Sequence, residues 1–253
     1  MSPAALTHPD VVPDCLRVLH VDAHLLAFDK PCGLLSVPGR GADKQDCLAT
    51  RVLAQWPDAR IVHRLDQATS GVMVFARNAG AQRALGAAFE QRRIDKRYVA
   101  IVDGWPHADA GVIALPLRAD WPNRPRQIVD HEAGKPALTR WRVLERLLAM
   151  DGAPCTRIAL NPETGRTHQL RVHLQASGHP ILGDALYACA AARGRAPRLL
   201  LHAEALDLDH PATGQRMRLA CAAPFQDPSG AASAAQGASA AGAHLPRRHE
   251  SRT

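Results

Sequence analysis

Residues 63–77, HRLDQATSGVMVFAR, place a single carboxylate, Asp66, between two apolar segments. The flanking runs RIVHRLD and GVMVFAR are typical of strands, and the small polar residues between them are typical of a turn. Acidic residues in turns usually form a surface ion pair, here with Arg64, or organise a hairpin. The alternative is a catalytic acid that an arginine keeps ionised at the end of a buried strand. This stretch alone leaves both interpretations open.

The rest of the chain predicts a strand-rich α+β fold. Strand-like runs alternate with turns in residues 15–39, and strands dominate again from residue 111 onward. Helices are expected over residues 43–56 and 79–93, the second of them capped by Asn78. We therefore expect one large, mainly antiparallel sheet with a few helices.

The folded unit is expected to span residues 10–225. After Phe225 the composition changes abruptly, and residues 226–253 are rich in Ala, Ser and Gly with almost no large apolar side chains. Such a segment cannot bury enough apolar surface to offset the entropy lost on ordering. We therefore expect a disordered tail.

The composition favours a nucleic-acid partner. The formal net charge is +7, and the 31 basic residues are all arginine except Lys30, Lys44, Lys96 and Lys135. Arginine binds phosphate bidentately and stacks on bases, although a GC-rich genome would enrich arginine without any functional meaning. The six cysteines contain no C-x-x-C pair, which argues against structural zinc and for reduced thiols. With no apparent signal peptide or membrane-spanning run, we expect a soluble, cytoplasmic protein.

A second candidate site is NPETGRTHQLRVHL, residues 161–174. A turn there precedes an expected helix, which Thr164 or Thr167 could cap. Arg166 would then lie at the positive end of the helix, in position to hold an anion. That anion could be a phosphate or Asp66, and the alternative is an ordinary solvated helix start.

Other catalytic classes lack their usual signatures. His168 and His173 are five residues apart, so one helical face cannot present both to a metal, and a zinc site is not expected. No G-x-S-x-G, Walker or G-x-G-x-x-G motif occurs, which disfavours serine hydrolases, NTPases and Rossmann enzymes. Tyr98 opens an apolar strand, where a tyrosine is usually a core residue and only sometimes stacks on a base.

Taken together, the motifs resemble a known family. HRLDQATSG, KRYVAIV and TGRTHQLRVHL with GHPILGD closely resemble, in that order, the signature stretches of the RluA family of pseudouridine synthases. The resemblance continues through KPCGLLSVPGR, DWPNRPRQ and GKPALTRWRV, and covers roughly residues 18–224. LLSVPGR and DWPNRP are most similar to the dual-specificity member of the family. Many relatives carry an N-terminal S4 domain, which is not expected here because so few residues precede the first strand.

The resemblance implies isomerisation of uridine to pseudouridine in structured RNA, with no cofactor and no metal. It implies a mixed sheet in two halves, flanked by helices and loops, with the active-site cleft between the halves. The implied partners are tRNA and 23S rRNA stem-loops, with targets at tRNA position 32 and 23S position 746. There are three competing hypotheses. The enzyme could modify another uridine within the family's range, or the protein could be a non-catalytic RNA-binding protein on this scaffold or a metal-dependent hydrolase. A monomer is expected.

The resemblance also implies roles for individual residues. Asp66 would be the essential catalytic residue, Tyr98 would lie against the target base, and Arg166 would pair with Asp66. Arg64 would occupy the space that the target nucleotide leaves in its stack. Phosphate contacts, which are tolerant of sequence, are expected from basic residues of the proline-rich loop, Arg124 and Arg126.

Overall fold

The computed structural model describes residues 16–225, so the expected tail and the first residues of the expected folded unit lie outside the described part. The strands are β1 (Arg17–Val21), β2 (Leu25–Lys30), β3 (Arg60–Ile61), β4 (Ser70–Ala76), β5 (Asp95–Asp103), β6 (Ala110–Ile113), β7 (Leu117–Ala119), β8 (Gln127–Val129), β9 (Thr139–Leu148), β10 (Pro154–Pro162), β11 (Leu201–Asp209) and β12 (Arg216–Ala220). The helices are α1 (Leu48–Gln55), α2 (Ala79–Glu90), α3 (Gln169–Ala176) and α4 (Ala190–Gly194), with a 3-10 turn, η1 (Ala42–Lys44).

Ten strands form one mixed sheet with the order β1-β2-β4-β11-β5-β10-β9-β6, to which β3 and β12 add at β4 and β11. The pairing of β4 with β11 is parallel, and the other described pairings are antiparallel. The short β7–β8 hairpin lies apart from this sheet. The expected α+β class with a mixed, mainly antiparallel sheet is confirmed.

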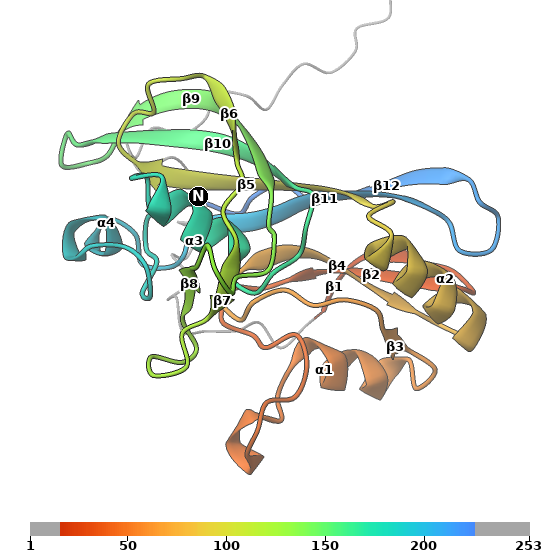
Figure 1. Ribbon diagram of the computed structural model, residues 1–253. Helices are drawn as coiled ribbons and strands as arrows, with labels where there is room; N and C mark the ends of the chain where they lie inside the picture. Colours follow the sequence, from red (N-terminus) through yellow and green to blue (C-terminus); the bar gives the residue numbers. More distant parts are fainter. Residues whose placement is uncertain (1–15, 226–253) are drawn as a thin grey trace, which may run out of the picture.

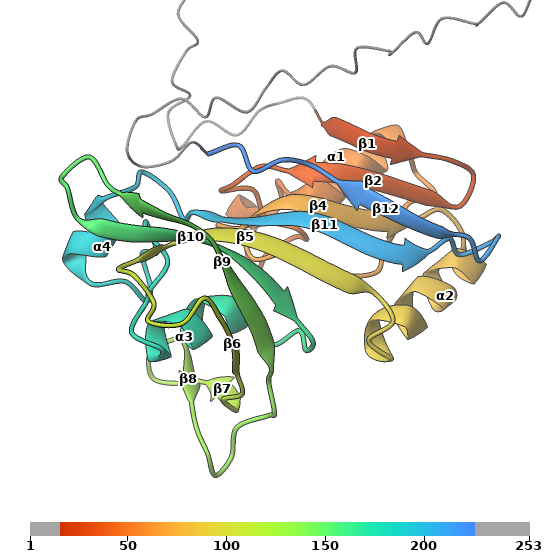
Figure 2. The same cartoon turned by 90° about the horizontal axis from the view of Figure 1, so that it is seen from above.

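The sheet has two halves that meet at β5 and β11 (Figures 1 and 2). One half carries β1–β4 with α1 and α2, and the other carries β6, β9 and β10 with α3 and α4. The second half includes a long antiparallel hairpin formed by β9 and β10. The cavity that holds the candidate active site lies between these halves.

Both faces of β4 are covered, which explains its unbroken apolar sequence. Val72 and Val74 pack in one core cluster with Leu85 of α2. Met73 and Phe75, which alternate with them, pack in another cluster that includes residues of α1. Side chains alternate between the faces of a strand, so a helix on each side requires apolar residues at every position. β4 therefore anchors the turn that precedes it.

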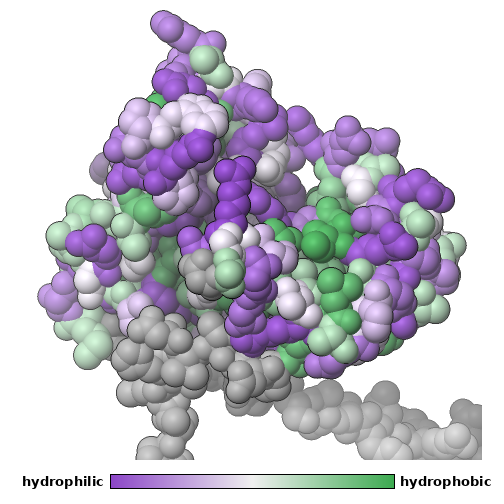
Figure 3. All heavy atoms as spheres, turned by 90° about the horizontal axis from the view of Figure 1, so that it is seen from below, coloured by the Kyte–Doolittle hydropathy of each residue, from purple (hydrophilic) through white to green (hydrophobic). Residues whose placement is uncertain are grey.

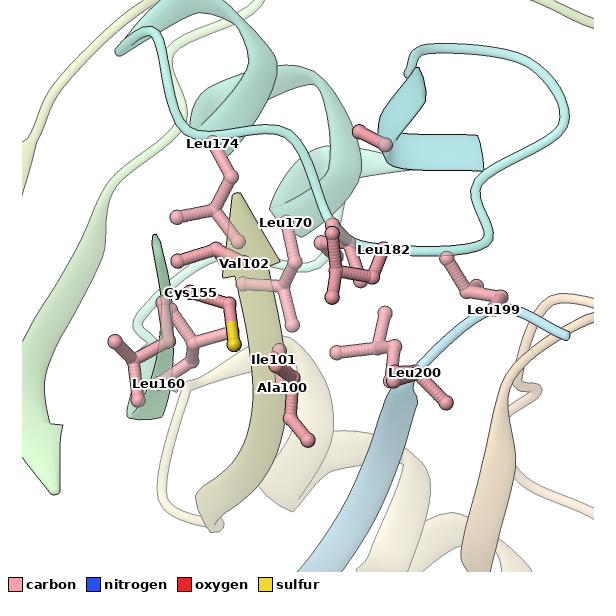
Figure 4. Packing of buried hydrophobic residues seen from close by; sticks show 14 of the residues in the cluster. Ala100, Ile101, Val102, Cys155, Leu160, Leu170, Leu174, Leu182, Leu199 and Leu200 are labelled. Atoms are coloured by element: carbon pink, nitrogen blue, oxygen red, sulfur yellow. The ribbon is translucent and has the colours of Figure 1, made fainter. Parts of the chain in front are cut away.

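In the other half, α3 is fixed by its leucines. Leu170 and Leu174 pack in one cluster with Ile101 of β5 and Leu160 of β10, together with Leu182 (Figure 4). Full burial of a leucine contributes about 1.5–3 kcal/mol. This packing holds the first turn of α3 close to the centre of the sheet.

The strand expected at residues 60–66 is wrong beyond Ile61, because a side chain replaces the backbone ladder. The N–H of Val74 in β4 donates to Nε2 of His63 (2.9 Å), so this N–H is satisfied without a neighbouring strand. β3 is consequently limited to Arg60–Ile61. The chain from residue 62 onward is free to leave the sheet and form the wall of a cavity.

The helix expected at residues 43–56 is also shorter than predicted, since α1 begins at Leu48 with Cys47 as its cap. The expected cap of α2 is confirmed, because the Asn78 side chain accepts a hydrogen bond from the Ala81 N–H (2.8 Å). No helix within residues 16–225 is long and apolar enough to cross a membrane. The face drawn in Figure 3 is covered mainly by hydrophilic residues, with smaller apolar areas between them.

Candidate active site

A cavity of about 570 Å³ opens between the two halves of the sheet. Its walls come from the segment before β4, the end of α2, the start of β5, the end of β10 and the start of α3. The size suits a single nucleotide-sized ligand. The polar residues on its walls include His63, Arg64, Asp66, Lys96, Tyr98, Arg166, His168 and Arg171.

Hydrogen bonds fix the turn that contains Asp66. The N–H of Thr69 donates to the Asp66 carbonyl (3.1 Å), and the carbonyl of Gln67 accepts from the N–H of Gly33 (2.9 Å). The Gln67 side chain returns a hydrogen bond to the Gly33 carbonyl (2.9 Å). Gln67 therefore ties the Asp66 turn to the turn after β2.

A buried lysine supports the same turn. The ammonium group of Lys30 donates to three backbone carbonyls, those of Pro31, Leu34 and Gln67, at 2.9, 2.7 and 3.0 Å. Burial lowers the pKa of Lys30 to about 7, while the charges of Cys32 and Asp66 oppose that shift. The three carbonyls match the three N–H donors of an ammonium group, so Lys30 fixes the backbone next to Asp66.

The exit from the turn requires glycine at position 71. Gly71 has φ +118°, and a Cβ there would lie 2.2 Å from the carbonyl oxygen of Ala203 in β11. Its φ and this close approach exclude a larger residue. Gly71 is therefore needed for the parallel contact between β4 and β11.

The expected ion pair between Arg166 and Asp66 is not formed. Nε of Arg166 donates to the carbonyl of Pro136 (3.1 Å), and its side chain is exposed at the rim of the cavity. The reason is that α3 begins at Gln169, three residues later than Arg166, which leaves the arginine in the preceding turn. Within residues 16–225 the basic group closest to the Asp66 carboxylate is His168, with Nε2 at 4.0 Å from Oδ2.

The buried cation on this wall is Arg171. Its guanidinium donates two hydrogen bonds to Asp184, at 2.8 and 2.6 Å, and both side chains are almost fully buried. Burial opposes the charge of Arg171, but Asp184 and then Asp66 raise its pKa. Arg171 is therefore a permanent positive charge, fixed in orientation, on the wall that faces Asp66.

The start of α3 is also built differently from the expectation. Neither Thr164 nor Thr167 caps the helix, and His168 occupies the cap position with φ 52° and ψ 18°. The side chain of Gln169 closes the turn instead, because its Oε1 accepts from the N–H of Arg166 (3.0 Å) and from Thr164 Oγ1 (2.7 Å). A histidine in the left-handed region is uncommon, and such positions concentrate at functional sites.

Tyr98 lies on β5, half-buried on the cavity wall. Burial, and then the negative charge of Asp66, raise the pKa of Tyr98. It therefore keeps its proton at neutral pH and presents a neutral ring and hydroxyl. Arg64 is exposed and lines the same cavity. Four of the expected residues therefore share one site, namely Arg64, Asp66, Tyr98 and Arg166.

The two loop arginines lie outside the cavity. The Arg124 guanidinium stacks 3.1 Å above the ring of Trp121, which is 66% exposed. Arg126 lies 5.3 Å from the Tyr187 ring. Both belong to the segment between β7 and β8 that projects from the body of the protein (Figure 1).

One group of potential metal ligands occurs among the described residues, away from this cavity. The ligand atoms of Asp29, His202 and Cys221 lie within 4.8 Å of one another. Both nitrogens of His202 already have partners, since Nδ1 contacts Ser70 Oγ (2.9 Å) and Nε2 contacts the Cys221 carbonyl (3.1 Å). Burial raises the pKa of the Cys221 thiol to about 12, which opposes the thiolate that a metal needs. These hydrogen bonds account for the cluster.

Sequence reasoning missed three parts of the site. Arg171 lies in the second candidate stretch, but nothing in that stretch distinguishes it from Arg166, and its partner Asp184 lies in the stretch GHPILGD. The sequence presents His168 only as a possible metal ligand, although it is the neighbour of Asp66. Lys30 gave a sequence signal only through its position before Pro31, in a segment that is distant along the chain.

The comparisons with known proteins agree with this geometry. Residues 24–176 match the family described as RNA pseudouridylate synthase. The chain is 51% identical over 210 residues to the dual-specificity RNA pseudouridine synthase RluA of Escherichia coli, covering 83% of this chain and 94% of that protein. It is 49% identical to the protein of the same name from Yersinia pestis, covering 82% and 99%.

Solved structures give the same result for the fold. The human RNA pseudouridylate synthase domain containing 1 superposes with a TM-score of 0.71 at 29% identity, covering 89% of this chain and 88% of that one. The human RNA pseudouridylate synthase domain containing 4 superposes with a TM-score of 0.64 at 28% identity, covering 82% and 88%.

Proposed function

Because the chain belongs to the RNA pseudouridylate synthase family and is an RNA pseudouridine synthase, we propose that Asp66 is its catalytic residue and that it modifies both a tRNA and 23S rRNA. The observation that supports the first part is the position of Asp66. Its side chain is 23% exposed on the wall of the central cavity, inside the segment that matches the family. Glu90 and Glu163 also line the cavity, but Asp66 is the carboxylate whose charge acts on the neutral Tyr98.

The chemistry requires a charged carboxylate close to the ribose. Uridine must break its C1′–N1 bond, turn the uracil, and form a C1′–C5 bond, after which C5 loses its proton and N1 gains one. An ionised carboxylate near C1′ supports these steps as nucleophile, as base toward the sugar, or as stabiliser of a cationic sugar. Each of these roles uses the charged form of Asp66, and the positively charged guanidinium of Arg171 lines the same cavity.

The neighbours of Asp66 supply the rest of the site. Tyr98 offers a flat face against which the freed uracil can stack while it turns, so the base is kept from escaping. Arg166 and Arg64 at the rim are placed to contact RNA, the latter in the space that the target nucleotide leaves when it is extruded. Extrusion costs a few kcal/mol and is cheapest in a loop, where pairing is weak. We propose no metal or cofactor in these steps.

The proposed targets follow the relatives named for dual specificity. The relatives' names give the dual specificity, and the resemblance of the motifs adds the two positions, the uridine at position 32 of a tRNA anticodon loop and the uridine at position 746 of 23S rRNA. The arginines of the loop between β7 and β8, Arg124 and Arg126, would contribute phosphate contacts that tolerate both sequences. The enzyme is proposed to act in the cytoplasm, where both RNAs are found, and to act as a monomer.

Tritium release from RNA labelled at uridine C5 tests this proposal. The RNAs are a tRNA with uridine at position 32 and a 23S stem-loop containing position 746, each compared with a transcript that carries cytidine at the target position. Release from both target RNAs, and from neither cytidine control, is expected. Release from only one RNA would contradict dual specificity, and release from neither would contradict both targets.

The role of Asp66 is tested by Asp66→Asn, with Asp46→Asn as the matched control. Asp46 is an exposed carboxylate paired with Arg51, away from the cavity. Asp66→Asn should abolish release and keep RNA affinity within about tenfold, since phosphate contacts dominate binding. Asp46→Asn should behave as the wild type. Substantial turnover by Asp66→Asn would remove Asp66 from the reaction.

A further inference from the structure

We propose that His168 is a positioning residue for Asp66, a neutral imidazole that Tyr187 locks with its Nε2–H directed at the carboxylate. The inference rests on the proposed catalytic role of Asp66. It extends that role to a residue pair, Tyr187 and His168, that lies behind the reacting groups and need not touch the RNA.

The first step is the direction of the hydrogen bonds at Tyr187. Its hydroxyl accepts from the backbone N–H of Gln127 (2.8 Å) and lies 2.7 Å from Nδ1 of His168. Within residues 16–225 the phenol proton has no other acceptor than this nitrogen. Tyr187 therefore donates to Nδ1, and a neutral His168 must carry its proton on Nε2.

The second step is where that proton points. Nε2 of His168 lies 4.0 Å from Oδ2 of Asp66, and the His168 side chain is only 10% exposed. This is longer than a hydrogen bond, but contacts of this kind are often long in a free enzyme and shorten when the substrate binds. The fixed tautomer thus presents a donor, rather than a lone pair, to the catalytic carboxylate.

The protonation states of the pair agree with this direction. Burial lowers the pKa of His168, although the charge of Asp66 acts against it. Burial raises the pKa of Tyr187, so the phenol keeps the proton that it donates. The groups that face His168 are the carboxylates of Asp66 and Asp184 and the guanidinium groups of Arg171 and Arg64.

Tyr187 is itself held firmly, which a lock requires. Its ring edge contacts the His168 ring at 5.6 Å between centroids, with the planes at 82°. The Arg171 guanidinium lies 5.1 Å from the Tyr187 ring centroid. The backbone N–H of Tyr187 donates to Oδ1 of Asp184 (3.2 Å), the carboxylate that also binds Arg171.

The backbone of His168 supplies an independent observation. The residue holds the left-handed conformation, φ 52°, at the start of α3 without capping the helix with its side chain. A non-glycine residue in that region carries strain that the surrounding structure must maintain. With this conformation His168 lines the cavity together with Asp66.

The test compares His168→Phe with His168→Gln. Phenylalanine keeps the ring and removes the donor, whereas the glutamine amide places an N–H close to the position of Nε2 and needs no tyrosine to orient a tautomer. With the labelled tRNA as probe, His168→Phe should lower kcat by about 10- to 100-fold, the effect of a hydrogen bond to a charged group. KM should stay within about threefold, and His168→Gln should recover most of the loss.

Two further measurements separate this role from a structural one. Tyr187→Phe should lower kcat in the wild type but have little added effect in His168→Gln, so the two changes are not additive. His179→Ala, a half-buried histidine bonded to the Asp103 carbonyl (2.9 Å), is the matched control and should keep the wild-type kcat. Additive losses, or a wild-type kcat in His168→Phe, would overturn the proposal.

The tautomer can be read directly even where a variant fails to fold. Nitrogen NMR of the wild-type protein labelled in its imidazoles should show His168 neutral at pH 7 with the proton on Nε2. A proton on Nδ1 would overturn the proposal whatever the variants do. The outcome is separable from the role of Asp66, because turnover by Asp66→Asn would overturn the proposed catalysis and leave the tautomer unchanged.

Discussion

The buried, neutral His63 should make the protein less stable in mild acid, because the imidazole gains a proton when the chain unfolds. Nε2 of His63 accepts the N–H of Val74 (2.9 Å), and the imidazole stacks on the Phe89 ring at 4.5 Å between centroids. A proton on Nε2 would face the Val74 N–H and break this hydrogen bond. Burial, and then the charge of Lys96, lower the pKa of His63 to about 3.

The sign and size of the effect follow from that shift. Since the folded-state pKa lies below the unfolded value near 6.5, the unfolded chain binds more protons between about pH 6.5 and pH 3. The free energy of unfolding should thus fall as the pH drops through this window. The full shift gives about 2 kcal/mol between pH 7 and pH 5, at 1.36 kcal/mol per pKa unit. His63 borders the open cavity, so we expect about half, or about 1 kcal/mol.

The assay is urea unfolding at pH 7 and pH 5 for the wild type and His63→Gln. Glutamine can accept the Val74 N–H and does not titrate, so the variant should lose about 1 kcal/mol less than the wild type over this interval. His131→Gln, at an exposed histidine, should match the wild type. Equal pH dependence in the wild type and His63→Gln would refute the role of the buried acceptor.

Three other substitutions test the framework around Asp66. Lys30→Met should lower the free energy of unfolding by about 2–4 kcal/mol in urea titrations, because it leaves buried carbonyls without donors. An unchanged unfolding midpoint would show that Lys30 does not support the turn. Gly71→Ala should lower the free energy of unfolding by more than about 3 kcal/mol, since its Cβ would overlap the Ala203 carbonyl. Gly86→Ala, where a Cβ would have no atom within 4 Å, is the control, and thermal melting should show it to be neutral or stabilising. Asp184→Asn should cost about 3–5 kcal/mol by leaving the buried charge of Arg171 without its partner, and it should also lower kcat. A melting temperature and kcat equal to the wild type would show that this pair is not needed.

Local signals predicted the elements well. The alternation of residues and the turn around Gly152 predict the β9–β10 hairpin, and Asn78 predicts the start of α2, because both depend on neighbours in the sequence. The continuous apolar run of β4 likewise predicts a strand covered on both faces. These features need no knowledge of distant parts of the chain.

Long-range contacts account for the errors. β3 stops at Ile61 because the His63 side chain, eleven residues from Val74, takes the place of a strand. A buried carboxylate, Asp184, fixes Arg171 and not Arg166 on the cavity wall. Asp184 lies thirteen residues after Arg171, so no local pattern shows which arginine it binds. A pattern of residue types cannot show which of several arginines a distant carboxylate selects, and only the packed structure decides it.

The catalytic role of Asp66 is tested most directly by single-turnover tritium release with the enzyme in excess over the labelled tRNA. RNA binding is measured on the same samples of the wild type and Asp66→Asn. We predict that Asp66→Asn binds within about tenfold of the wild type and releases tritium at least about 10³-fold more slowly. Release within about tenfold of the wild-type rate would contradict the assignment of the reaction to this carboxylate.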